Sequence, residues 1–201
     1  MRQWLRQPAA WWLVLLVGLL PFAWLVGLTF LDQLGANPTE FLTRATGDWT
    51  LRSLCVVLAV TPLRTALGWP ELARFRRMLG LLTYFYAVLH LACYALFDMG
   101  LDLADIVTDI PKRPFILVGF AAWLLLSAMA LTSFNRAIRW LGGKRWQLLH
   151  RTVYVVAVLA VLHFAWMRAG KNNFDEVLVY AAVLALLLAW RFGRWVRKLR
   201  A

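Results

Sequence analysis

Three histidines are the residues of this sequence whose type and spacing could do chemistry, because imidazole is the commonest nitrogen ligand of metals in proteins. His90, His150 and His163 all lie in or at the start of strongly apolar runs. An ionisable side chain in such a run is costly in lipid unless it has a partner, so each is a candidate for function. A simpler alternative stays open, in which each histidine hydrogen-bonds a neighbouring backbone carbonyl in a packed helix bundle.

The elements that must position these histidines are apolar runs of membrane-spanning length. The chain has 201 residues, of which 62% are hydrophobic, and a helix of about 20 apolar residues crosses the ~30 Å hydrocarbon core of a bilayer. We therefore expect an all-α fold, a bundle of six transmembrane helices that forms a single integral membrane domain over residues 1–201. The predicted spans are 11–30, 50–68, 78–97, 115–134, 147–167 and 175–192.

Two of these predicted spans carry further expectations. The first is too long for the core of a cleaved signal peptide, so we interpret it as a retained span. The second contains Thr61-Pro62, and a proline inside a helix predicts a kink or an early inner end.

Charge predicts the direction of the spans. If the N-terminus is cytoplasmic, the inner segments and the tail, from Arg2 to Arg200, collect most of the 22 lysines and arginines, and the acids apart from Glu71 fall on the outer side. Because lysines and arginines near the ends of spans are enriched on the cytoplasmic side of a membrane, both termini are predicted to be cytoplasmic. The net charge of +12 is then explained by lipid headgroups and topology, and no nucleic-acid partner is expected.

His90 and His163 lie at similar depths in spans that run in the same direction. By helical rise they are roughly 18 Å and roughly 24 Å from the inner ends of their spans. Two imidazoles at one level could ligate a single haem iron from opposite faces. Zinc would need three or four ligands. Copper is less excluded, but it would favour a nearby Met or Cys, and Cys55 and Cys93 lie in separate apolar runs. We therefore predict His90 and His163 as the axial ligands of a haem.

His150 cannot share a metal with His163. It precedes His163 by thirteen residues, which on an ideal helix separates the two side chains by about 20 Å along the axis and about 140° around it. Arg76 stands where an inner partner for His150 would be expected, and arginine does not normally ligate iron. It could instead pair with a haem propionate, a flavin phosphate or a lipid phosphate, or act only as a membrane anchor. The predicted inner site, for a second haem, a flavin or a quinone, comprises His150, Arg76, Arg77, Trp146 and Arg151.

Several segments together resemble a known family. They are "TPLR" at 61–64, "RRMLGLLTYFYAVLHLACYALFDMG" at 76–100 and "GKRWQLLHRTVYVVAVLAVLHF" at 143–164. They are similar to the MsrQ family, the haem-binding membrane subunits of bacterial periplasmic methionine sulfoxide reductase systems, and more widely to ferric reductase and NADPH oxidase membrane domains. In that wider group the third and fifth spans each carry two haem-ligating histidines; here Arg76 replaces one. The resemblance implies the bacterial inner membrane, one or two b haems, and FMN.

The same resemblance implies an electron-transfer subunit rather than a catalytic one. Its donor would be the quinone pool or a cytosolic flavin reductase, and its acceptor the periplasmic molybdenum subunit MsrP, which reduces methionine sulfoxide in proteins. A stand-alone ferric reductase, a quinol-oxidising cytochrome b and a non-redox membrane scaffold or transporter are the alternatives. The outer aspartates recur at helical spacing, as a solvated loop or as a docking patch for MsrP; they are Asp98, Asp102, Asp105 and Asp109.

Overall fold

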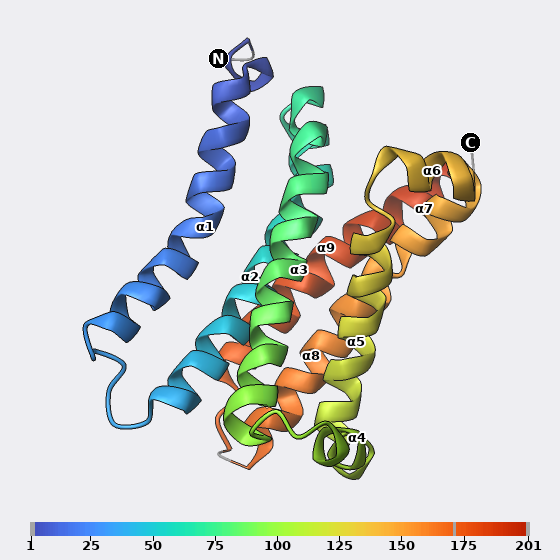
Figure 1. Ribbon diagram of the computed structural model, residues 1–201. Helices are drawn as coiled ribbons and strands as arrows, with labels where there is room; N and C mark the ends of the chain where they lie inside the picture. The colour runs from blue at the N-terminus through green and yellow to red at the C-terminus, as the bar shows by residue number, and fades with distance from the viewer. Residues whose placement is uncertain (1–2, 171, 200–201) are drawn as a thin grey trace. The chain divides into compact units, whose positions relative to one another are not determined.

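The computed structural model describes residues 3–170 and 172–199, and within them the regular secondary structure is entirely helical. Arg2 and Arg200, two cations used in the topology prediction, lie outside the described residues. The chain forms two compact units, residues 1–101 and 102–201 (Figure 1). The prediction of a single membrane domain stays a prediction.

The first unit is built on a pair of long helices. These are α2 (Pro38–Ala66) and α3 (Arg76–Cys93), which pack along each other (Figure 1). The side-chain oxygen of Asn37 accepts a hydrogen bond from the Glu40 backbone N–H, 3.2 Å away, so α2 begins with a capping residue followed by proline. The remaining elements are η1 (Trp4–Arg6), α1 (Pro8–Phe30), η2 (Pro70–Phe75) and a π-helical turn, η3 (Tyr94–Asp98).

The second unit is built on a corresponding pair. Helix α5 (Pro114–Leu131) packs along α8 (Val153–Ala169), and α9 (Asp175–Leu199) packs on α8. Gly142 separates two short helices with φ 73°, a conformation that glycine adopts without steric cost. The short helices are α4 (Leu103–Lys112), α6 (Asn135–Leu141) and α7 (Gly143–Arg151).

Five helical segments of the described chain are long and apolar enough to cross a membrane. They are Pro8–Phe30, Pro70–Asp98, Pro114–Leu131, Gly143–Ala169 and Asp175–Leu199. Helix α2 has 29 residues but carries Glu40, Arg44, Asp48 and Arg52 in its first half. The expected helical class is thus confirmed, while the sixth span and the cytoplasmic termini are not.

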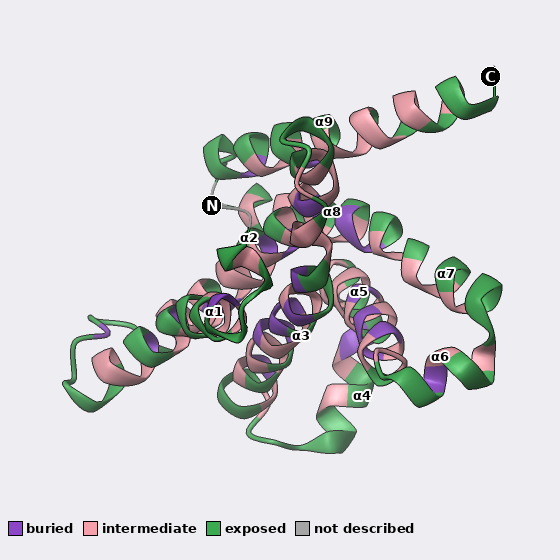
Figure 2. Ribbon diagram, turned by 90° about the horizontal axis from the view of Figure 1, so that it is seen from above, coloured by how far each residue is buried: buried purple, intermediate pink, exposed green. Residues whose placement is uncertain are grey.

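The surface of these helices fits lipid rather than water. Leu16 and Leu20 on α1 are 60% and 61% exposed, and Leu186 on α9 is 71% exposed. Figure 2 shows both helices mostly in the colours of exposed and intermediate residues. Apolar exposure of this extent marks a surface that is covered by another apolar phase.

Several boundaries differ from the predicted ones, most of all in the second and fifth spans. Helix α2 begins twelve residues before the predicted 50–68 span and continues past Pro62 to Ala66, so the expected early end at this proline is wrong. The helix continues through Pro62, and beyond it the Thr65 hydroxyl donates to the Thr61 carbonyl over 3.1 Å. The predicted 147–167 span is divided at Thr152 between α7 and α8.

Candidate functional site

His90 lies on α3 against the neighbouring helix α2. Its Nδ1 is 2.8 Å from the backbone carbonyl oxygen of Thr43. A carbonyl oxygen can only accept, so Nδ1 must carry the proton and donate it. The imidazole ring rests on Gly47, where an added Cβ would lie 3.0 Å from the ring carbon Cε1 and 3.2 Å from Nδ1. Glycine is therefore what allows the ring to approach α2 this closely.

His163 repeats this arrangement in the second unit. Its Nδ1 donates to the backbone carbonyl of Phe115 on α5, over 2.7 Å. The ring rests on Gly119, where a Cβ would lie 2.8 Å from Nδ1 and 2.9 Å from Cε1. The Phe115 ring is tilted beside the imidazole, with centroids 6.5 Å apart.

The two arrangements share one plan. On the neighbouring helix a carbonyl binds the histidine, and four residues later a glycine makes room for it. The carbonyl and its histidine are 47 residues apart in one unit and 48 in the other. We call these two sites the His90 cradle (Thr43, Gly47, His90) and the His163 cradle (Phe115, Gly119, His163).

The cradles bear on both explanations of the histidines. The hydrogen bond to a carbonyl is the one that the simpler alternative predicted, but it occupies only Nδ1. With the proton on Nδ1, the lone pair of the neutral imidazole is on Nε2, the nitrogen through which histidine binds a metal. Metal-ligating histidines commonly donate their other N–H to a backbone carbonyl, which fixes the tautomer and orients the ring. The carbonyl bond therefore satisfies a polar group and is also the bond that a metal-ligating histidine would make.

The donor set suits haem better than a free metal ion. Among the described residues there is no group of three or more His, Cys, Asp or Glu that could hold a metal ion. A porphyrin supplies four nitrogens of its own, so its iron needs only axial ligands such as a single imidazole on each face. An oriented imidazole in each unit suits such an axial position, whereas zinc would lack ligands.

His150 has a different environment. Its Nδ1 is 3.1 Å from the Trp146 carbonyl one turn earlier in the same helix α7, and the Trp146 ring stacks on the imidazole with centroids 4.0 Å apart. The indole N–H of Trp146 donates to the Thr132 carbonyl over 2.9 Å. The structure thus brings together two members of the predicted inner site, on a helix of the second unit.

The other members of the predicted inner site lie elsewhere. Arg76 and Arg77 open α3 in the first unit, and the Arg76 guanidinium donates to the Thr61 hydroxyl over 3.4 Å. Arg151 is exposed at the end of α7. The grouping of all five residues stays a prediction.

Two of the four aspartates predicted to face the outer side, Asp102 and Asp109, have local structural roles. Asp102 caps α4, accepting hydrogen bonds from the backbone N–H groups of Ala104 and Asp105 at 2.8 and 3.1 Å. Asp109 forms an ion pair with Arg113, with a 2.8 Å bond from Nε. Asp98 closes η3. A role of these four residues in docking stays a prediction.

Sequence reasoning missed the residues that hold the two histidines. Thr43 and Phe115 act through backbone carbonyls, which leave no trace in the sequence. Gly47 and Gly119 carried the only available signal, because an isolated glycine inside a helix costs stability and usually has a packing or functional reason.

Comparisons with known proteins agree with this arrangement. Residues 46–161 match the ferric reductase like transmembrane component family, so the chain is a membrane protein of that class. Three relatives are each described as a protein-methionine-sulfoxide reductase heme-binding subunit MsrQ. The protein of Polaromonas naphthalenivorans (strain CJ2) is 64% identical over 200 residues, 99% of this chain and 91% of the relative.

The other two relatives extend the likeness. Those of Ralstonia nicotianae (strain ATCC BAA-1114 / GMI1000) and Herminiimonas arsenicoxydans are 57% and 50% identical, covering 91% and 92% of this chain and 84% and 86% of the relatives. Within its class, the chain therefore belongs to the MsrQ family, and it is a multi-pass protein of the bacterial inner membrane. No solved structure matches the chain.

Proposed function

We propose that the chain is the haem b electron-transfer subunit of a periplasmic methionine sulfoxide reductase, with His90 and His163 as axial ligands of one iron. The observation that carries the proposal is the pair of matching cradles, in which a backbone carbonyl holds each Nδ1–H. The names of the relatives support the same role.

Haem iron supplies reversible one-electron chemistry when bound. The histidines would hold it through Nε2. The Thr43 and Phe115 carbonyls keep the imidazoles in one tautomer and orientation, and they raise the basicity of the ligating nitrogen. Gly47 and Gly119 let each ring sit against a neighbouring helix, which restricts its rotation.

The proposed topology has six spans with both termini in the cytoplasm. Helix α2 is the sixth span, since it is long enough to cross and packs along α3. Glu40 and Arg44 lie near its first end, where they would reach the outer headgroups, whereas Asp48 and Arg52 lie deeper and would have to be satisfied within the helix bundle. The excess of lysine and arginine at the opposite ends supports this orientation.

Electrons would enter at the inner side and leave at the outer side. The entry site we propose comprises His150, Arg76, Arg77, Trp146 and Arg151, and it would take a second haem, a flavin such as FMN, or a quinone. The donor is the quinone pool or a cytosolic flavin reductase, and the acceptor is the molybdenum subunit MsrP. The acidic outer residues Asp98, Asp102, Asp105 and Asp109 would guide that subunit to the membrane surface.

The test is a reconstitution with haem quantified per chain by the pyridine haemochrome assay. In liposomes with an external electron donor, the full chain is expected to support MsrP-dependent reduction of a methionine sulfoxide substrate. Neutralising all four aspartates should slow that transfer at low salt more than at high salt, because at high salt the ions already screen the attraction that would draw MsrP to the aspartates. Absence of a Soret band at saturating haem supply would contradict the proposal. Rapid reduction of ferric chelates without MsrP would instead favour a stand-alone ferric reductase.

A further inference from the structure

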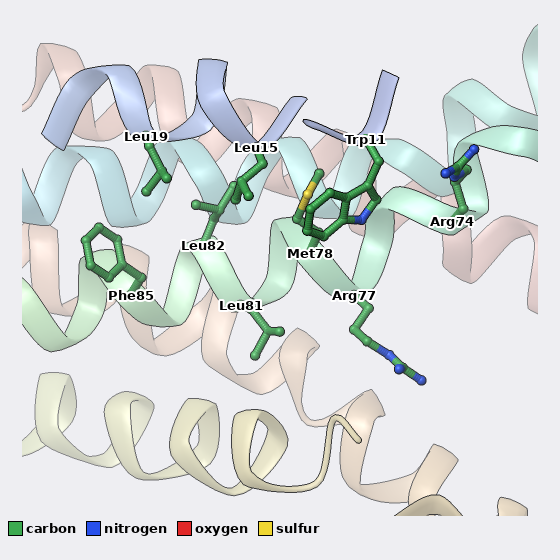
Figure 3. Close-up of a pocket in the computed structure, with 9 residues that line it drawn as sticks. All are labelled: Trp11, Leu15, Leu19, Arg74, Arg77, Met78, Leu81, Leu82 and Phe85. Atoms are coloured by element: carbon green, nitrogen blue, oxygen red, sulfur yellow. The ribbon is translucent and has the colours of Figure 1, made fainter. Parts of the chain in front are cut away.

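A groove runs between α1 and α3 in the first unit. Its volume is about 600 Å³, and seven of its nine lining residues are apolar or aromatic (Figure 3). Trp11, Leu15 and Leu19 come from α1, and the remaining residues come from η2 and α3. Arg74 and Arg77 both lie toward one end, where their side chains point in different directions (Figure 3). The groove therefore has an apolar body and a cationic end.

The two helices that form the groove also pack closely against each other beside it. An added Cβ at Gly18 would lie 2.4 Å from Leu82 Cδ1, and the Tyr86 hydroxyl donates to the Gly18 carbonyl over 2.7 Å. Nearby, Ala10 and Met78 belong to a buried cluster. These contacts tie α1 to α3, so the groove is a built feature rather than a loose gap.

The cationic end is also held in place. Arg74 Nη1 donates to the Leu5 carbonyl over 2.8 Å, and its guanidinium lies over the Phe75 ring, 5.5 Å from the centroid. A guanidinium has five N–H donors, so the bond to Leu5 uses one and fixes the direction of the others. Arginine in this setting suits a phosphate oxygen, which accepts charge-assisted hydrogen bonds.

The length of the groove matches one leaflet. From Arg74 to Phe85 the chain advances eleven residues, or roughly 16 Å of helical rise. Half of the hydrocarbon core is about 15 Å. A phospholipid whose phosphate met Arg74 would therefore extend its acyl chain to about Phe85, near the middle of the bilayer.

We propose that this groove is a binding site for an anionic phospholipid, whose phosphodiester pairs with Arg74, with Arg77 as a second cation at the same end, and whose acyl chain lies along Leu15, Leu19 and Leu81. Basic pockets beside transmembrane helices on the cytoplasmic side are the sites where anionic lipids bind. The proposal does not depend on haem. It uses the cytoplasmic N-terminus only to assign the site to the inner leaflet.

The experiment is native mass spectrometry of the full chain in detergent, titrated with phosphatidylglycerol or phosphatidylcholine of identical acyl chains. We expect a preference for phosphatidylglycerol that falls about tenfold in Arg74→Gln/Arg77→Gln, as expected when charge-assisted hydrogen bonds are lost. The matched control is Arg136→Gln/Arg139→Gln, which removes two cations from α6 and should leave the preference unchanged. Circular dichroism verifies that each variant is folded.

A second variant tests the apolar half of the site. Leu81→Trp should fill the groove and weaken phosphatidylglycerol binding with both arginines intact, whereas Leu124→Trp, at a similarly exposed position of α5, should not. Equal binding of the two lipids, or an unchanged preference in both groove variants, overturns the proposal. Full competition by glycerol phosphate overturns it in favour of a simple anion site. Displacement by a short-chain quinone, with no response to anionic lipid, overturns it in favour of a quinone site.

Discussion

The His90 cradle and the His163 cradle hold an imidazole in the same way but differ in the side chains around it. In both, a backbone carbonyl and a glycine four residues later hold an imidazole from a neighbouring helix. The His163 ring sits closer to its glycine, and its neighbour is the Phe115 ring. The His90 ring has the Thr46 hydroxyl 3.5 Å from Nδ1. The two cradles share the backbone carbonyl and the glycine, which orient the ring. They differ in the neighbouring side chains, which can adjust the electron density of the imidazole.

The largest expected effect comes from removing either histidine. If both cradles hold one iron, His90→Ala and His163→Ala should each reduce haem per chain by more than about tenfold. Losing only a group that hydrogen-bonds a metal ligand already costs about 10–100-fold in metal affinity, and here the ligand itself is lost. The double variant should then lose no more than either single variant. The pyridine haemochrome assay on purified protein measures the ratio directly.

The control for these variants is His150→Ala. His150 bonds within its own helix and rests on Trp146 rather than on a glycine of a neighbouring helix, so its replacement should retain the haem held by the other two histidines. It should slow electron entry from the donor. Loss of half the haem in each single variant, and of all of it only in the double, would mean that each cradle holds a haem of its own.

The comparison also separates what the sequence could predict from what it could not. Apolar runs near 11–30, 78–97, 115–134, 147–167 and 175–192 all became helices long enough to cross a membrane, because length and apolarity are local properties. The true start of α2 was also readable, since Asn37-Pro38 with Glu40 three residues after the cap is a helix-start signal.

The cradles themselves could not be predicted, because they depend on the register of one helix against another. Gly27, Gly80 and Gly193 are helical glycines just as Gly47 and Gly119 are, yet an added Cβ at any of the three would meet nothing within 4 Å. Nothing local distinguishes the two groups. The anchoring carbonyls are equally invisible, since every residue has one.

The second prediction uses that distinction among glycines. Gly119→Ala places a Cβ 2.8 Å from His163 Nδ1, and Gly47→Ala places one 3.0 Å from His90 Cε1. Overpacking of this kind costs roughly 1–3 kcal/mol, so both variants should bind haem more weakly, with the larger loss for Gly119→Ala. The displaced ring should also shift the ferric EPR g-values.

Gly80→Ala is the matched control, because it lies on α3 and faces open space. It should leave haem content and g-values unchanged and stabilise the helix slightly. If Gly80→Ala perturbs the spectrum as much as Gly47→Ala does, the glycines act through general helix stability and not through the ring contact.

The smallest effect should come from making one cradle more like the other. Thr46 immediately precedes Gly47, and Val118 stands at the corresponding position before Gly119, so Thr46→Val removes the extra hydroxyl of the His90 cradle. That hydroxyl donates to the Leu42 carbonyl over 2.7 Å, so toward His90 it can only accept. The acceptance is weak, because the oxygen is 3.5 Å from Nδ1 and the Nδ1–H already donates to the Thr43 carbonyl. Losing a weak acceptor makes the imidazole slightly less electron-rich, which stabilises ferric iron less and raises the reduction potential. A contribution of about 0.5 kcal/mol corresponds to a rise of about 20 mV for one electron, with haem content unchanged.

Potentiometric titration of the Soret band measures the reduction potential. The control is Thr50→Val: Thr50 lies one turn after Thr46, and its hydroxyl donates to the Thr46 carbonyl. A potential that falls, or a loss of haem, would show that Thr46 holds the helix pair together and does not tune the ligand.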